Sequence, residues 1–236
     1  AVVPAASWLK CSGTITASSA GIRLTSGATV GSVSNSGTIF GAYNGIYLSR
    51  SSSVTGAITN EATGTIASSS GSGAAILLSS NSSAGSITNN GTISGGRGGI
   101  RLQANTGSPT GGLGGSSVTG DITNTGTISG SSAGISLDSG SSIVGSIINS
   151  GEIAGNNAAI DIRGGSSIGG SITNEVGGTI IGRTASSSGT GSAIYVSGSS
   201  IGGSITNSGT ITGGIYLNNA STVTGSITNN AGASIS

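Results

Sequence analysis

Histidine and methionine are absent from this sequence, which contains one cysteine, two prolines, one tryptophan and one phenylalanine. The missing histidine removes the commonest general base, and with it every catalytic triad or zinc motif that requires one. A single cysteine cannot form a disulfide within the chain. These absences argue against an enzyme and against a disulfide-stabilised fold.

Charge is also scarce, since 6% of the 236 residues are charged and the formal net charge is +1. A nucleic-acid-binding surface needs clustered Lys and Arg, and a membrane-spanning helix needs about 18 consecutive apolar residues. Because the sequence has neither, we expect no nucleic-acid partner and no membrane span. Calcium-binding solenoids need an Asp that recurs with the repeat, and the acids here do not recur, so no metal and no cofactor is expected. The acidic residues are Glu61, Asp121, Asp138, Glu152, Asp161 and Glu175.

What the sequence does contain is a repeated phrase, Ser-Ile-Thr-Asn-x-Gly-Thr-Ile, with clear copies beginning at Ser86, Asp121 and Ser204. The asparagines of successive copies are separated by 25, 29, 35, 25, 25, 33 and 22 residues. The repeating unit is therefore about 25 residues long with insertions, in the range typical of solenoids and propellers. These anchor asparagines are Asn35, Asn60, Asn89, Asn124, Asn149, Asn174, Asn207 and Asn229.

Residues 118–137 form one clean unit. Alternating apolar and polar residues over 118–124 predict a strand with one buried face, and two further short strands are expected over 126–130 and 134–137. Turns rich in Gly, Ser and Asn separate them. Propeller blades need about 40–50 residues and four strands. We therefore predict an all-β fold, a parallel β-solenoid of triangular section with about eight coils.

Stacked coils would place like residues above one another. The isoleucines of the repeat would then form buried columns, each side chain contributing roughly 1.5–3 kcal/mol. The anchor asparagines precede a turn on the inward side and are expected to form a structural ladder of amides. Cys11 takes the place of an anchor asparagine, because Cys11-Ser-Gly-Thr-Ile aligns with Asn35-Ser-Gly-Thr-Ile, and is expected to be a small buried residue.

The Gly-Ser-Ile-Thr-Asn-x-Gly-Thr-Ile-x-Gly units, such as residues 203–213, resemble the repetitive passenger regions of bacterial autotransporters and related β-helical surface adhesins. The resemblance covers nearly the whole chain. It implies a right-handed β-helix that is secreted and displayed on the cell surface. Export also fits a chain that begins Ala-Val-Val-Pro, as a mature protein would after removal of a signal peptide.

Distinctive side chains gather at the outward position of the third strand. Among them, Arg101, Asp161, Tyr195 and Tyr216 form a possible binding face for a glycan or a host-surface partner, with aromatic packing as the alternative for the two tyrosines. Asp138, Asp161 and Arg163 would be the best enzyme candidates, although a surface ion pair explains them more simply. No catalytic residue is assigned. In coil order the column is Arg23, Tyr47, Leu77, Arg101, Ser136, Asp161, Tyr195 and Tyr216.

Two further surfaces could carry recognition. Outward Thr and Ser in pairs such as Thr210-x-Thr212 would suit ice binding, but β-branched residues also suit any exposed strand. Insertions at 67–73, 103–115 and 183–192 would protrude from the corners of the solenoid. The 103–115 loop is the first choice for a specific contact with a partner. The alternative is that it is a flexible insertion which the fold tolerates and which has no role in binding.

Solenoids normally need capped ends, and neither end of the sequence shows a cap pattern. We expect residues 1–8 to be an N-terminal docking segment and residues 9–236 the solenoid, with Val2, Val3, Trp8 and Ile235 at the contact between subunits. The leading hypothesis is a non-enzymatic, extracellular or cell-surface structural protein that stacks head to tail with itself into a filament. The alternative is a stem or binding module of an autotransporter-type adhesin.

Overall fold

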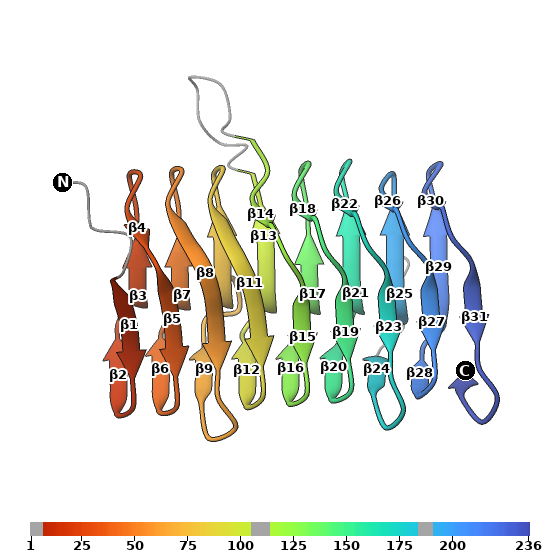
Figure 1. Ribbon diagram of the computed structural model, residues 1–236, viewed down its shortest axis with the longest axis horizontal. Helices are drawn as coiled ribbons and strands as arrows, with labels where there is room; N and C mark the ends of the chain where they lie inside the picture. Colours follow the sequence, from red (N-terminus) through yellow and green to blue (C-terminus); the bar gives the residue numbers. More distant parts are fainter. Residues whose placement is uncertain (1–6, 105–113, 184–190) are drawn as a thin grey trace.

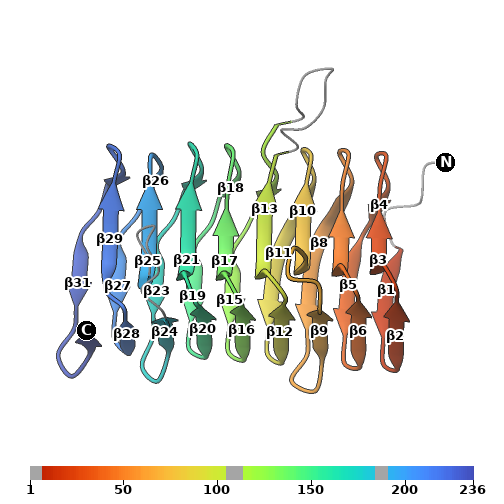
Figure 2. The same ribbon diagram turned by 180° about the vertical axis from the view of Figure 1, so that it is seen from behind.

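The computed structural model describes residues 7–104, 114–183 and 191–236, and all the regular elements in these ranges are β-strands. The chain winds into a rod, with its N-terminal and C-terminal coils at opposite ends (Figure 1). The view from behind shows the same succession of coils (Figure 2). The all-β, parallel β-solenoid predicted from the repeat is confirmed.

Three parallel sheets form the sides of the rod, here called sheets A, B and C. Sheet A has 15 strands in the described ranges: β1 (Trp8–Cys11), β4 (Thr29–Val30), β5 (Ser32–Asn35), β8 (Ser53–Asn60), β11 (Ser83–Asn89), β14 (Ser117–Val118), β15 (Ile122–Asn124), β18 (Ser142–Ile143), β19 (Ile147–Asn149), β22 (Ser167–Ile168), β23 (Ile172–Asn174), β26 (Ser200–Ile201), β27 (Ile205–Asn207), β30 (Thr222–Val223) and β31 (Ile227–Asn229). Sheet B has 9: β2 (Thr14–Ala17), β6 (Thr38–Gly41), β9 (Thr65–Ser68), β12 (Thr92–Gly95), β16 (Thr127–Gly130), β20 (Glu152–Gly155), β24 (Thr179–Gly182), β28 (Thr210–Thr212) and β32 (Ser234–Ile235). Sheet C has 8: β3 (Ala20–Leu24), β7 (Asn44–Leu48), β10 (Ala74–Ser79), β13 (Gly98–Gln103), β17 (Ala133–Leu137), β21 (Ala158–Arg163), β25 (Ser192–Ser197) and β29 (Ile215–Asn218).

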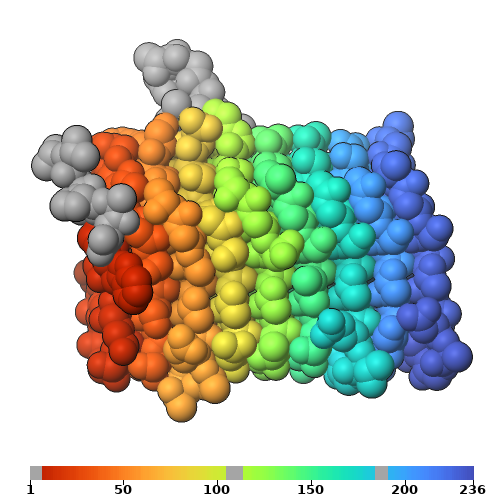
Figure 3. Space-filling view, in the orientation of Figure 1, coloured from red at the N-terminus to blue at the C-terminus, as the bar shows by residue number. Residues whose placement is uncertain are grey.

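Equivalent residues of neighbouring coils lie directly over one another. Ile122 pairs with Ile147 and Asn124 with Asn149 in sheet A, and Ile128 pairs with Ile153 in sheet B. Each coil appears as a band across the rod in sequence order (Figure 3). Since neighbouring strands lie about 4.8 Å apart, the rod is about 40 Å long.

The interior consists of columns of branched aliphatic side chains from all three sheets. Ile122, Ile128 and Ile135 of one coil are fully buried, and so are their counterparts in the next coil. Isoleucine and valine suit this narrow interior because they fill it without the bulk of an aromatic ring. The predicted isoleucine columns therefore form the core.

The predicted asparagine ladder is present on the inner side of sheet A. The Nδ2 group of Asn124 donates to Oδ1 of Asn149 at 2.8 Å, and Asn149 donates in the same way to Asn174 at 2.8 Å. The second N–H of Asn149 faces the carbonyl oxygens of Gly151 and Thr179, at 3.0 and 3.2 Å. Each amide thus joins two coils and also satisfies one carbonyl group of the turn that follows it and one of sheet B in the next coil. The same donation links all eight anchor asparagines from Asn35 to Asn229.

Cys11 occupies the first position of this ladder, and its backbone pairs with that of Asn35. Its Sγ lies 3.3 Å from the carbonyl oxygen of Gly13 and 3.7 Å from that of Thr38. Asn35 makes the equivalent contacts one coil later, to Gly37 and Thr65. The thiol does not donate to Asn35, whose buried Oδ1 has no hydrogen-bond partner. Cys11 is buried, as the alignment of the repeat predicted.

Glycine is required where sheet B turns into sheet C. A Cβ built on Gly155 would lie 1.9 Å from the carbonyl oxygen of Ala158, and one built on Gly95 would lie 1.7 Å from that of Gly98. The backbone therefore passes too close for any side chain, which explains why the repeat ends in Gly.

A second buried ladder, made of serines, lies at the corner between sheets C and A and was not predicted. The hydroxyl of Ser141 donates to the carbonyl oxygen of Asp138 at 2.7 Å, and the backbone N–H of Ser141 donates to Oγ of Ser166 at 3.2 Å. The sequence signal is a Ser-Ser pair before an apolar residue. The buried members are Ser52, Ser82, Ser116, Ser141, Ser166 and Ser199.

The strand predicted over 118–124 is divided into β14 and β15, whereas the equivalent β8 and β11 are continuous. A third polar column lies at this position of the repeat. The backbone N–H of Ser146 donates to Oδ1 of Asp121 at 2.7 Å, and that of Ser171 donates to Oγ of Ser146 at 3.0 Å. Side chains take these N–H groups in the two coils that follow, where the strand is likewise divided, into β18 and β19 and into β22 and β23.

Asn149→Leu should lower the free energy of unfolding by about 3 kcal/mol, because it leaves one N–H of Asn124 and Oδ1 of Asn174 buried without their partners. Thermal or denaturant unfolding followed by circular dichroism would measure this. Asn90→Leu, which changes a half-exposed turn asparagine, should shift stability by only about 0.5 kcal/mol and serves as the control. Equal stabilities of the two variants would contradict a structural ladder.

Cys11→Asn should raise the free energy of unfolding by about 1 kcal/mol, because the new amide can donate to the unpartnered Oδ1 of Asn35. Cys11→Ala supplies no donor and should not stabilise the protein. The comparison requires unfolding curves of the two variants under the same conditions. If the asparagine variant were no more stable than the alanine variant, the ladder would not extend to this position.

Candidate binding groove

The outward column predicted on the third strand is in register on sheet C. Arg101 pairs with Ser136, Ser136 with Asp161, Asp161 with Tyr195, and Tyr195 with Tyr216. The N-terminal part of the column, from Arg23 to Leu77, pairs in the same way. Residues far apart in the sequence therefore become neighbours along one side of the rod.

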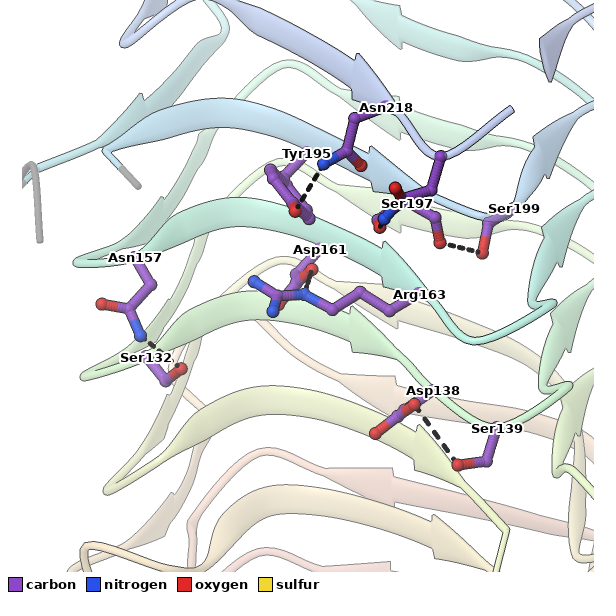
Figure 4. A network of polar contacts seen from close by, with 11 residues as sticks. Ser132, Asp138, Ser139, Asn157, Asp161, Arg163, Tyr195, Ser197, Ser199 and Asn218 are labelled. Carbon is purple, nitrogen blue, oxygen red and sulfur yellow. Dashed lines mark hydrogen bonds and ion pairs between the residues drawn. The ribbon is translucent and has the colours of Figure 1, made fainter. Parts of the chain in front are cut away.

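The middle of this column is a chain of contacts (Figure 4). Nε of Arg163 donates to Oδ1 of Asp161 at 2.5 Å. The Arg163 guanidinium carbon lies 4.5 Å from the ring centroid of Tyr195, within the range of a cation–π contact. Tyr195 stacks on Tyr216 with centroids 5.5 Å apart and an interplanar angle of 9°, and its hydroxyl accepts from Nδ2 of Asn218 at 3.3 Å. Both faces of the Tyr195 ring are covered.

The two stacked tyrosines differ in their exposure to solvent. Tyr195 is 6% exposed, whereas Tyr216 is 48% exposed at the C-terminal end of sheet C. An exposed aromatic face is needed to stack on a sugar or a partner side chain, and Tyr216 alone of this pair offers one. Tyr195 contributes by holding Arg163 in place.

Burial has the largest effect on the pKa of Asp161, the acidic residue in this chain of contacts. It raises the pKa of Asp161 above the ordinary range, although the hydrogen bond and the charge of Arg163 act in the opposite direction. Burial also lowers the pKa of Arg163, but the hydrogen bond and charge of Asp161, with smaller contributions from Tyr195 and Asp138, raise it overall. The pair is therefore held together in a site where its carboxylate is poorly solvated.

A groove of about 190 Å³ crosses sheet C beside this chain, over β13, β17 and β21. It opens at Ser136, whose small side chain lies between those of Arg101 and Asp161 in the column. Its polar walls include Arg97, Arg101, Asp138, Asp161 and Arg163. The structure therefore brings together Arg101 and Asp161 of the predicted binding face. Asp138 and Arg163, which with Asp161 were the enzyme candidates, line the same groove.

Arg97 was not among the predicted site residues. It belongs to the turn between β12 and β13, so the alternation of a strand could not place it. The signal available in the sequence was its spacing of four residues from Arg101. A binding site on a solenoid can therefore include residues from a turn at the corner as well as residues from a sheet.

A second hollow, of about 210 Å³, lies where sheet B turns towards sheet C and is lined by Ser94, Ser129, Gly155 and Arg183 among others. Its arginine is already paired, since Nη2 of Arg183 lies 2.7 Å from Oε1 of Glu152. The groove on sheet C, where cations lack partners, is the stronger candidate for a ligand.

The outward threonines of sheet B are also in register, with Thr92 opposite Thr127, but Thr127 is followed along its column by Glu152. The neighbouring column is mixed, for example Ala154 opposite Ile181. A regular two-dimensional array of threonines, which ice binding would use, is therefore not formed.

The remaining predicted residues lie at the ends or outside the described ranges. Trp8 begins β1 and is 79% exposed, and Ile235 lies in β32 and is 37% exposed, at the opposite end. Val2 and Val3 lie outside the described residues, and so do most of the 103–115 and 183–192 insertions. Of the insertion at 67–73, residues 67–68 belong to β9 and residues 69–73 form the turn between β9 and β10.

Comparison with protein-family models, with curated proteins and with solved structures found no match. Among the described residues, no helix is long and apolar enough to cross a membrane. The described part of the chain also holds no group of three or more Cys, Asp or Glu side chains arranged to bind a metal ion. The resemblance to autotransporter passenger regions thus depends on the repeat phrase alone.

Because the folded protein raises the pKa of Asp161, the native state binds this proton more readily than the unfolded chain does, and stability should fall as pH rises through that pKa. Asp161→Asn should remove this dependence. The melting temperature of the variant relative to the unmodified protein should therefore increase from pH 4 to pH 8. Glu175→Gln, at an exposed turn, controls for the loss of one negative charge. A difference that stays constant with pH would contradict the burial of Asp161.

Proposed function

We propose that this protein is a non-enzymatic structural subunit, located outside the cell or on its surface, that stacks head to tail with further copies into a filament. The extracellular location in this proposal follows from the resemblance of the repeat. The stacking has independent support from the two ends of the rod.

The main support is that the internal columns run through the first and last described coils, to β1 and β2 at one end and to β31 and β32 at the other. Within the described residues no helix covers either end. Leu9 at the N-terminal end is 37% exposed and Ile227 at the C-terminal end is 48% exposed, whereas their counterparts between them are buried. The first and last described coils thus carry the same kind of apolar surface that the inner coils bury against one another.

The two ends also match in register. Leu9 and Ile227 belong to one column of sheet A, and Ile15 and Ile235 belong to one column of sheet B. A second copy that continued the winding would therefore pair its β1 with β31 and its β2 with β32. Such a joint would satisfy strand edges that are otherwise open.

Burial of apolar surface at the joint would stabilise an association. Complete burial of an exposed aliphatic side chain contributes roughly 1.5–3 kcal/mol, and Leu9, Ile227 and Ile235 are 37%, 48% and 37% exposed, so each would contribute about half of this or less. Association costs about 4–15 kcal/mol in lost freedom. The apolar contacts alone do not exceed this cost, so the joint would also depend on the pairing of strand edges.

Sheet C ends one strand earlier than sheet B at the C-terminal end, because β32 has no successor in sheet C within the described residues. This leaves Tyr216 and Leu217 open beside the proposed joint. The hypothesis that residues 1–8 of a neighbouring copy fill this space concerns mostly residues outside the described ranges. The proposal therefore depends on the described strands at the two ends of the rod and not on residues 1–6.

The second candidate is a stem or binding module of a surface adhesin. The groove on sheet C favours it, because a ligand site on the side of a rod needs no contact between copies. The two candidates are compatible with one another, since the groove and the ends lie on different surfaces.

Ile227→Lys should block filament growth, because it places a charge in the apolar column at the proposed joint. Negative-stain microscopy and sedimentation of the full chain should show filaments for the unmodified protein and isolated rods for the variant. Val176→Lys makes the same kind of change at a side turn, where Val176 is 83% exposed, and should leave filaments intact. Isolated rods from the unmodified protein, or normal filaments from the Ile227 variant, would overturn the proposal.

A further inference from the structure

The groove on sheet C contains cations without partners. Asp161 is engaged by Arg163, and Oδ1 of Asp138 accepts from Oγ of Ser139 at 3.3 Å. Within the described residues, neither Arg97 nor Arg101 makes a hydrogen bond or an ion pair. Two guanidinium groups are therefore free to bind an anion.

Arg101 is the more constrained of the two. Its side chain is half-buried on the sheet, and burial lowers its pKa, with repulsion from Arg97 as the next cause; Asp138 and Asp161 oppose this only in part. The groove is lined by three arginines and two aspartates, so its positive side chains outnumber its negative ones. An anionic group between the two arginines would supply the missing charge and could accept their N–H groups in pairs.

The rest of the groove is suited to hydroxyl groups. Asp138 provides acceptors, while Ser136 provides a hydroxyl that both donates and accepts. Nδ2 of Asn157 donates to Oγ of Ser132 at 3.2 Å along the same wall. A ligand with one acidic group and several hydroxyls would therefore find a partner at each position.

The volume limits the size of that ligand. Clefts that enclose drug-sized molecules measure about 300–1,000 Å³, and this groove measures about 190 Å³. It suits a single small ring. Arg163 is held by Asp161 and Tyr195, so this side of the groove is formed before any ligand arrives.

We propose that this groove binds an acidic sugar unit, with the carboxylate between Arg97 and Arg101 and the hydroxyls towards Asp138, Ser136 and Asn157. The site lies on the side of the rod, over β13, β17 and β21, and does not depend on head-to-tail stacking. A glycan chain carrying such a unit could extend from the groove along or away from the rod.

Saturation-transfer NMR and calorimetric titration of the full chain would test this with two probes, methyl glucuronide and methyl glucoside, which differ in the carboxylate. The glucuronide should bind at least about tenfold more tightly than the glucoside. Equal binding of the two sugars, or no binding of the glucuronide, would overturn the proposal. Acetate that binds as tightly as the glucuronide would overturn the assignment of a sugar.

The residues can be tested separately. Arg101→Gln and Arg97→Gln should each weaken glucuronide binding by about tenfold or more, and Arg97 is exposed, so its replacement should leave the fold intact. Arg183→Gln, which removes a cation from the other hollow, should bind like the unmodified protein. Undiminished binding by both groove variants, or an equal loss in the Arg183 variant, would overturn the assignment.

Discussion

The structure depends on the hydrogen bonds that join each coil to the next. Strand pairing and the asparagine ladder both require that a coil follow the outline of its neighbour closely, because a shift of one residue would move every inward side chain to the surface. Extra residues can therefore be accommodated only at corners, and the two longest steps of the repeat, 35 and 33 residues, contain the 103–115 and 183–192 insertions. The same constraint explains the glycines at the tight turns and the aliphatic columns inside.

This construction also determines how a site can be built. Each coil contributes one outward residue to a given position, so Arg101, Ser136 and Asp161 become adjacent although 25 or more residues separate them. The backbone beneath them is held by pairing on both sides. A change at one outward position can therefore alter the groove without changing the fold, which makes the side of the rod suited to carrying a specific contact.

The sequence alone was sufficient for the fold class, the anchor asparagines, the isoleucine columns and the outward column of sheet C, because all of these follow from the repeat and from strand alternation. Corner chemistry was harder to predict. The serine ladder and the polar column that begins at Asp121 and Ser146 arise from side chains that take backbone N–H groups, and Ser-rich stretches occur almost everywhere in this chain. Arg97 was missed for a related reason, since it lies in a turn. The burial of Asp161 beside Arg163 depends on side chains of the neighbouring coils. The sequence predicts which residues are neighbours but not the distances between their atoms.

The asparagine ladder has one more consequence. Every link runs the same way, with Nδ2 of one coil donating to Oδ1 of the coil that follows it. The amide dipoles therefore point in a single direction and add along the axis. The rod is polar, and its two tips are not equivalent. At one tip the column ends in the Nδ2 group of Asn229, and at the other it ends in Cys11, which has no side-chain amide. Any assembly that extends this ladder must keep all its members pointing the same way, and its two growing tips would then differ in their chemistry.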